Sequence, residues 1–208
     1  MSDPAFNKAT VFVVDDDQAM RNSLKWLIES VGMQVESFSS ADEFLAQYQP
    51  GRAGCLVLDV RMPGMSGLDL QEHLAERNIL TPVVIITGHG DVPMAVRAMK
   101  GGAIDFIEKP FNDEVLLDAI RRAIIYEEQQ RSHHSEHLQI QERLSNLTPR
   151  EHEVMAMVTE GRSNKEIANA LGVSAKTIEA HRARVMEKMQ AGSLAELVRM
   201  VLAVNGTD

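Results

Sequence analysis

The chain has 208 residues, 44% of them hydrophobic and 25% charged, which is typical of soluble globular proteins and sufficient for one large domain or two small ones. It lacks a run of ~18 apolar residues, and residues 1–4 lack the basic and apolar parts of a signal peptide, so we expect a cytoplasmic protein with no membrane partner. The single cysteine, Cys55, lies in an apolar run, which excludes an internal disulfide and indicates a buried structural thiol.

The formal net charge of −9 is unevenly distributed along the chain. Residues 1–125 contain 18 acids and 11 bases, a balance of −7, and residues 126–146 contain 4 acids and 2 bases, a balance of −2. Residues 147–208 contain 8 of each, but within them residues 161–190 hold 6 bases against 3 acids. The acidic surplus therefore belongs to the first part, and a local basic patch in the last part indicates nucleic-acid binding.

Short apolar runs alternate with helical patterns over the first 125 residues, which predicts βαβ units and a parallel sheet. The runs at 10–14, 55–58 and 83–86 are apolar throughout and suit central strands buried on both faces. Residues 34–38 alternate polar and apolar as an edge strand does, and residues 104–108 form a further strand.

Helix signals separate these strands. Apolar residues recur at helical spacing after Asp17 until Gly32 ends the helix. Residues 40–43 form a capping box that begins a second helix, and another helix begins after Asn112.

The segment that follows is polar from residue 127 to residue 137, and no proline or glycine occurs between residues 112 and 148. We predict one long helix or a helix pair with a solvated middle, because flexible linkers usually carry Gly, Pro or Ser. A solvated connector is favoured over a metal site at His133, His134 and His137, because no acid or cysteine set completes such a site.

The last segment holds three helix starts. Residues 148–151 and 163–166 form capping boxes, and Ser174 caps a third, basic helix. Gly172 lies in the short turn before that helix, so the pattern predicts a helix-turn-helix.

Polar side chains stand at the carboxyl ends of the predicted parallel strands, which face one crevice. They are Asp15, Asp16, Asp59, Thr87 and Lys109. Two carboxylates ~4 Å apart repel by ~4 kcal/mol at an effective dielectric of about 20, so the cluster needs a cation. Oxygen ligands favour Mg²⁺, with Mn²⁺ as a substitute. The pattern predicts transfer of a phosphoryl group to a carboxylate, with Lys109 and Thr87 contacting its oxygens.

These residues lie in motifs that resemble the receiver domain of two-component response regulators. The motifs are VVDDD at 13–17, LDVRMPGMSG at 58–67, Thr87, and KPF at 109–111. The resemblance covers about residues 8–125 and implies a flavodoxin-like (βα)5 fold with strand order 2-1-3-4-5.

The same resemblance implies a role for each site residue. Asp59 would be the phosphoacceptor. Asp16, Asp59 and the backbone carbonyl of Arg61 would ligate Mg²⁺, and Asp15 would help through water. The Lys109–Pro110 bond would be cis.

Phe106 occupies the position of the switch aromatic in that family. The resemblance implies that it turns inward when Thr87 engages the phosphoryl group. Many relatives carry Tyr at this position, and Phe lacks the hydroxyl.

The basic helix that begins at Ala175 has a face suited to DNA. With Ile178, Val185 and Met189 in the core, the opposite face combines small residues, which allow close approach to base edges, with bases that suit phosphates. Glu179 cannot bind phosphate but can accept a hydrogen bond from a cytosine amino group. The predicted DNA contacts are Lys165, Lys176, Thr177, Glu179, Ala180, Arg182, Ala183, Arg184 and Lys188.

Residues 145–208 resemble the LuxR-type DNA-binding domain, through LTPRE at 147–151, NKEIA at 164–168, TI at 177–178, HR at 181–182 and KM at 188–189. The whole chain is thus similar to FixJ-type response regulators of the NarL/FixJ class. Residues 193–200 fit the fourth helix of that domain, which the family uses for packing and dimer contacts. Some relatives have Lys where Glu179 stands and read bases with it.

We therefore predict an α/β plus all-α protein with a receiver domain at 1–125, a long helical linker at 126–144 and a four-helix LuxR-type helix-turn-helix domain at 145–208. A sensor histidine kinase would phosphorylate Asp59, which promotes homodimerisation and binding to double-stranded promoter DNA. We expect a transcription regulator, usually an activator, and not an enzyme.

Two alternatives stay open at this point. A Mg²⁺-dependent phosphohydrolase with an Asp nucleophile would use a similar sheet, but its nucleophile follows the first strand and it needs a cap segment. A DNA-binding protein whose receiver serves only as a dimerisation module is disfavoured by the intact set of Asp16, Asp59, Thr87 and Lys109.

Overall fold

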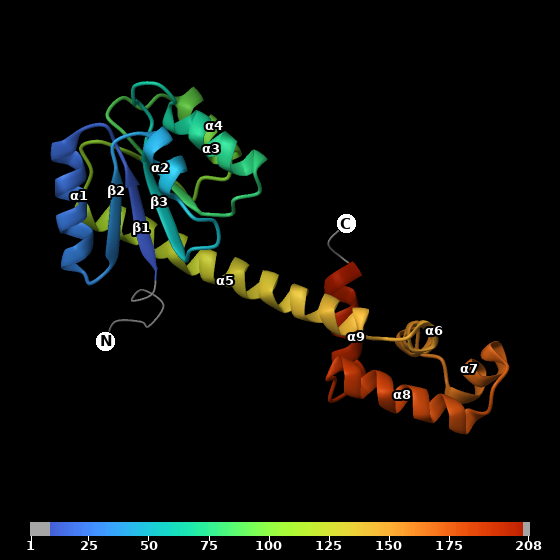
Figure 1. Ribbon diagram of the computed structural model, residues 1–208. Coiled ribbons are helices and arrows are strands. Elements are labelled where there is room, and N and C mark those ends of the chain that lie inside the picture. The colour runs from blue at the N-terminus through green and yellow to red at the C-terminus, as the bar shows by residue number, and fades with distance from the viewer. Residues whose placement is uncertain (1–8, 206–208) are drawn as a thin grey trace. The chain divides into compact units, whose positions relative to one another are not determined.

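The computed structural model describes residues 9–205 (Figure 1). The expectation about a signal peptide falls on residues 1–4, outside the described part. The chain divides into two compact units, Met1–Arg131 and Ser132–Asp208. No helix among residues 9–205 is long and apolar enough to cross a membrane.

The first unit contains a five-stranded parallel sheet. Its strands follow the order β2-β1-β3-β4-β5, so the predicted sheet topology is confirmed. β2 lies at an edge and is largely exposed, as its alternating pattern predicts, whereas β1, β3 and β4 are buried along their length. The strands span Thr10–Val14 (β1), Gln34–Phe38 (β2), Gly54–Asp59 (β3), Val83–Thr87 (β4) and Asp105–Glu108 (β5).

Helices cover both faces of this sheet, which explains why the central strands are apolar at every position (Figure 1). On one face, Val11, Val13 and Val57 pack with helices α1 (Gln18–Ser30) and α5 (Asp113–Ser145). On the other face, Phe12 and Leu56 pack with the remaining helices. These are α2 (Ala41–Gln47), α3 (Gly67–Glu76) and α4 (Val92–Lys100).

The start of α2 differs in one detail from the predicted capping box. The Ser40 hydroxyl accepts the backbone N–H of Glu43, as predicted. The Glu43 carboxylate, however, accepts the N–H and hydroxyl of Ser39 rather than the N–H of Ser40. The turn before α2 thus extends the capping interaction by one residue.

The connector is a single helix, since α5 runs without a break from Asp113 to Ser145. Residues 128–136 are exposed, in agreement with the predicted solvated middle. Glu127 is buried and forms an ion pair with Arg131, with 3.2 Å between Oε1 and Nε, and the exposed stretch begins at the next residue. Further along α5, Ile140 is buried in the hydrophobic core of the second unit.

The second unit is helical. Thr148 with Glu151 and Ser163 with Glu166 form both predicted capping boxes, at the starts of α6 and α7. Gly172 ends α7 with φ 66°, a left-handed conformation that favours glycine. Ser174 then caps α8. The helices are α6 (Pro149–Thr159), α7 (Asn164–Leu171), α8 (Ala175–Met189) and α9 (Leu194–Asn205), the last longer than the predicted 193–200.

Candidate phosphoryl site and nucleic-acid interface

Asp15, Asp59 and Lys109 meet at the carboxyl ends of β1, β3 and β5, as the parallel topology requires. The Lys109 Nζ donates to Asp15 Oδ2 at 2.7 Å and to Asp59 Oδ1 at 2.8 Å. Both carboxylates are buried, with 1% of Asp15 and 5% of Asp59 exposed. One cation therefore bridges two buried anions.

The second oxygen of each carboxylate accepts a backbone N–H. Asp59 Oδ2 accepts from Arg61 at 2.6 Å, and Asp15 Oδ1 accepts from Asp17 at 2.8 Å. These bonds fix the orientation of the two carboxyl groups.

The charges in this cluster do not balance. Burial raises the pKa of Asp59, and the neighbouring Asp15 acts in the same direction, although the bonds from Lys109 and Arg61 oppose both effects. Burial disfavours the charge of Lys109 as well, but its two carboxylate partners outweigh that effect and raise its pKa. The lysine thus stays charged, and the burial penalty falls on Asp59.

Asp16 lies beside this cluster with an exposed side chain that makes no hydrogen bond or ion pair within residues 9–205. Arg61 is exposed and contributes its backbone next to Asp59. The carboxylates of Asp15, Asp16 and Asp59 and the Arg61 carbonyl are hard oxygen donors of the kind that Mg²⁺ prefers. Within residues 9–205, however, no three acidic, histidine or cysteine side chains are arranged to hold a metal ion.

Thr87 and Phe106 lie on neighbouring strands next to this cluster. Thr87 is fully buried, its carbonyl accepts the Lys109 N–H at 2.7 Å, and its hydroxyl accepts the His89 N–H at 3.3 Å. Phe106 is half-buried, and its ring lies against Gly90, where an added Cβ would approach Phe106 Cε1 to 3.1 Å and Thr87 Cγ2 to 3.4 Å. The aromatic ring and the hydroxyl residue thus border the same loop. The Lys109–Pro110 bond is cis.

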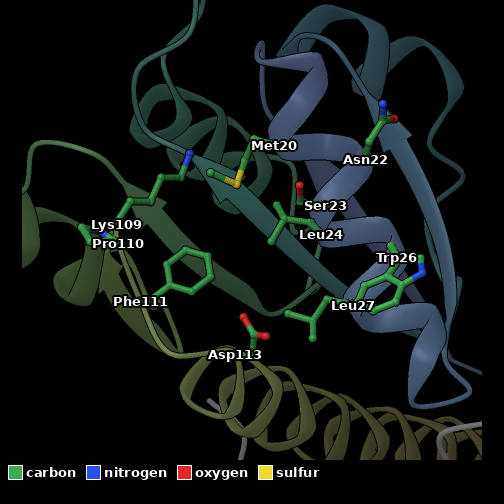
Figure 2. Close-up of a pocket in the computed structure, with 10 residues that line it drawn as sticks. All are labelled: Met20, Asn22, Ser23, Leu24, Trp26, Leu27, Lys109, Pro110, Phe111 and Asp113. Atoms are coloured by element: carbon green, nitrogen blue, oxygen red, sulfur yellow. The ribbon is translucent and has the colours of Figure 1, made fainter.

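A cavity of about 580 Å³ opens beside the site, between α1 and the segment that joins β5 to α5 (Figure 2). Lys109 lies at one end of it and Trp26, 75% exposed, at the other. Met20, Leu27 and Phe111 give it a mostly apolar lining. Of the three residues that meet at the strand ends, only Lys109 lines this cavity.

The basic face of α8 is exposed in its first three turns. Ile178, Val185 and Met189 are buried, as predicted, so the opposite side of the helix faces solvent. The exposed predicted DNA contacts are Lys165, Lys176, Thr177, Glu179, Ala180, Ala183 and Arg184.

Three of the predicted DNA contacts have side-chain partners inside the unit, and one of them is Thr177, whose hydroxyl lies 2.8 Å from the Ser174 hydroxyl. Arg182 is half-buried and donates to Asn164 Oδ1 at 2.9 Å. Lys188 donates to Glu151 Oε2 at 2.7 Å and to the Asn146 carbonyl at 3.1 Å. The structure therefore does not bring Lys188 to the exposed face as a free cation.

Comparison with known proteins assigns both parts of the chain. Residues 11–121 match the response regulator receiver domain, and residues 145–201 match the bacterial regulatory proteins of the luxR family. The chain is a two-component response regulator with a LuxR-type DNA-binding domain. The family inferred from the sequence motifs is confirmed.

Individual relatives match the response regulator over nearly its whole length. It is 50% identical over 196 residues to nodulation protein W of Bradyrhizobium diazoefficiens, covering 94% of this chain and 86% of that one. It is 47% identical over 205 residues to the transcriptional regulatory protein FixJ of Rhizobium meliloti, covering 93% and 95%. The solved structure of the response regulator StyR matches with a TM-score of 0.86 and 46% identity, over 93% of this chain and 98% of that one.

Two residues that pack against the candidate phosphoryl site were given no role from the sequence. Arg21 is 8% exposed and donates to the Asp15 carbonyl at 2.6 Å, which fixes the end of β1. Gly67, the first residue of α3, packs so closely that an added Cβ would lie 2.1 Å from the Asp59 carbonyl oxygen. Gly67 was visible as part of a motif, whereas Arg21 looked like any polar residue of a surface helix.

Proposed function

We propose that a sensor histidine kinase transfers a phosphoryl group to Asp59 of this response regulator. The N–P bond of the kinase phosphohistidine breaks, and a carboxylate oxygen of Asp59 forms the new O–P bond. The observation that carries the proposal is the bridging of Asp59 and Asp15 by Lys109. That lysine is placed to neutralise charge on the carboxylate and on an incoming phosphoryl group.

Asp15, Asp16, Asp59 and the Arg61 carbonyl would hold Mg²⁺, or Mn²⁺ in its place. The ion would neutralise phosphoryl oxygens during the transfer. The unpaired Asp16 supports this assignment, since the three carboxylates carry more negative charge than Lys109 alone balances.

We further propose that Thr87 donates its hydroxyl to a phosphoryl oxygen and that Phe106 changes position in response. This proposal is supported by Gly90, which lies next to both the Phe106 ring and the Thr87 side chain. The rearranged face of α4 and β5 would then favour a homodimer.

In the dimer, two copies of α8 would enter successive major grooves of promoter DNA, with half-sites one helical turn apart. Lys165, Lys176, Arg182 and Arg184 would contact phosphates, and Thr177, Glu179, Ala180 and Ala183 would lie close to base edges. We assign activation of transcription, in the cytoplasm, as the outcome, and we expect no turnover of a substrate by the protein itself.

The proposal is tested by comparing the metal-loaded protein with and without beryllofluoride, a phosphoryl mimic. We expect Mg²⁺ with beryllofluoride to increase the dimer fraction in size-exclusion chromatography and the affinity for DNA. Asp59→Asn should abolish both responses. An unresponsive wild type, or an equal response in Asp59→Asn, would reject the proposal.

A further inference from the structure

Glu179 is the one exposed acid in the first two turns of α8. The two residues before it have contacts within the unit, because Ile178 is buried and the Thr177 hydroxyl lies 2.8 Å from the Ser174 hydroxyl. Glu179 itself makes no hydrogen bond or ion pair within residues 9–205. Its carboxylate is therefore available to a ligand at the end of the helix that would meet base edges.

The neighbouring bases do not neutralise this carboxylate. Lys176, one turn before it, forms no ion pair with it, and Arg182, three residues after it, is bonded to Asn164 instead. Ala180 and Ala183 leave the surface beside it open. In the first two turns of α8, an unpaired acid thus stands among exposed basic and small residues.

Such an acid weakens binding to a phosphate backbone unless it finds a hydrogen-bond donor. In the major groove only cytosine N4 and adenine N6 donate, while guanine O6 and N7 and thymine O4 would repel a carboxylate. Adenine N6 lies next to the acceptor N7, whereas cytosine N4 lies next to a C–H group. Cytosine is therefore the base that an acceptor-only side chain prefers.

We propose that Glu179 is a specificity-determining residue that selects cytosine at one position of each DNA half-site. The inference rests on the proposed function, in which α8 enters the major groove. The inference concerns the preference for a base. It does not concern affinity for the DNA phosphate backbone, which the Glu179 carboxylate repels.

The test is selection from a randomised double-stranded DNA library by the full chain, with Mg²⁺ and beryllofluoride. The wild type should select cytosine at one half-site position by roughly 5- to 100-fold over other bases. Glu179→Gln should change the preference there to adenine, because an amide can bond N6 and N7 together. Glu179→Ala should reduce discrimination at that position to less than about 3-fold.

Glu187→Gln is the matched control, because Glu187 is an exposed acid of the same helix, near its other end, without a side-chain partner in the described residues. Both substitutions remove one negative charge and should raise general DNA affinity alike. Only the change at Glu179 should alter the selected base. Selected sites without that cytosine, or a Glu179→Gln profile equal to that of Glu187→Gln, would overturn the inference and leave the proposed function intact. A wild type that selects no DNA sequence would overturn both.

Discussion

Lys188 and Glu151 form an ion pair, with 2.7 Å between Nζ and Oε2, that joins the last turn of α8 to the first turn of α6. Only 4% of the Glu151 side chain is exposed. The same carboxylate accepts the Thr148 N–H at 2.9 Å in the capping box. One acid thus joins the start of α6 to the last turn of α8.

We predict that Lys188→Met lowers the free energy of unfolding of the second unit by about 2 kcal/mol, because it leaves Glu151 buried without its cation. The slope of log DNA affinity against log salt should stay unchanged, since Lys188 is already paired. Lys176→Met is the control: stability should change little, and the slope should fall by about 1. Denaturant unfolding and salt titrations measure both. An equal loss of slope in the two variants would assign Lys188 to the phosphate backbone.

The same acid predicts how the second unit responds to pH. The hydrogen bond from Lys188, followed by that from the Thr148 N–H, lowers the pKa of Glu151 to about 2. A carboxyl whose pKa is depressed on folding contributes stability that is present above its unfolded pKa, near 4.5, and is lost as pH falls toward 2. Glu151→Gln should therefore flatten the acid limb of the stability curve, measured by circular dichroism between pH 5 and pH 2. A limb of the same steepness in the variant would contradict this assignment.

The fold was predictable because local signals and long-range packing agree. Apolar runs such as residues 10–14 specify buried strands, and each polar residue of the site directly follows such a run, so topology alone gathers Asp15, Asp59 and Lys109. Two of the predicted capping boxes, at Thr148 and Ser163, formed as their sequences indicate.

The sequence did not reveal which side chains pair with residues that are distant in the chain. Glu151 was read as half of a capping box and Lys188 as a DNA contact, yet 37 residues separate the members of this ion pair. The charge of Lys188 fits either role, and only packing brings it to Glu151. Arg21 is similar, because its bond to the Asp15 carbonyl depends on how α1 returns over β1.

The close packing around Asp59 makes a steric prediction. Gly67→Ala would place a methyl group 2.1 Å from the Asp59 carbonyl oxygen, a distance that forces backbone movement. We expect the free energy of unfolding of the receiver to fall by about 2 kcal/mol or more, together with a loss of beryllofluoride binding.

Gly88→Ala provides the control for this steric effect. Gly88 lies in the loop after β4 and has nothing within 4 Å of an added Cβ. Its substitution should change stability by less than about 0.5 kcal/mol. Similar unfolding midpoints for the two variants would show that the backbone at Gly67 can relax.

The acidic cluster predicts a pH effect of opposite sign to that of Glu151. Because burial raises the pKa of Asp59 above 3.8, the folded receiver holds this proton more tightly than the unfolded chain. The stability that the protonated Asp59 carboxyl contributes is therefore fully present below pH 3.8. It is lost as the pH rises through the raised pKa. Asp59→Asn removes the buried charge and should raise the metal-free Tm at pH 7 by ~3 °C, for a gain of about 1 kcal/mol.

Magnesium should offset the same penalty in the wild type. An ion that binds only the folded state at ten times its Kd stabilises that state by about 1.4 kcal/mol. We expect Mg²⁺ to raise the wild-type Tm and to have little effect on Asp59→Asn, which lacks one of the proposed ligands. Asp118→Asn, which removes an exposed charge from α5, should respond to Mg²⁺ as the wild type does. A Tm of Asp59→Asn below that of the metal-free wild type would show that Asp59 stabilises the fold through Lys109, and that the charge of the cluster is balanced without a metal.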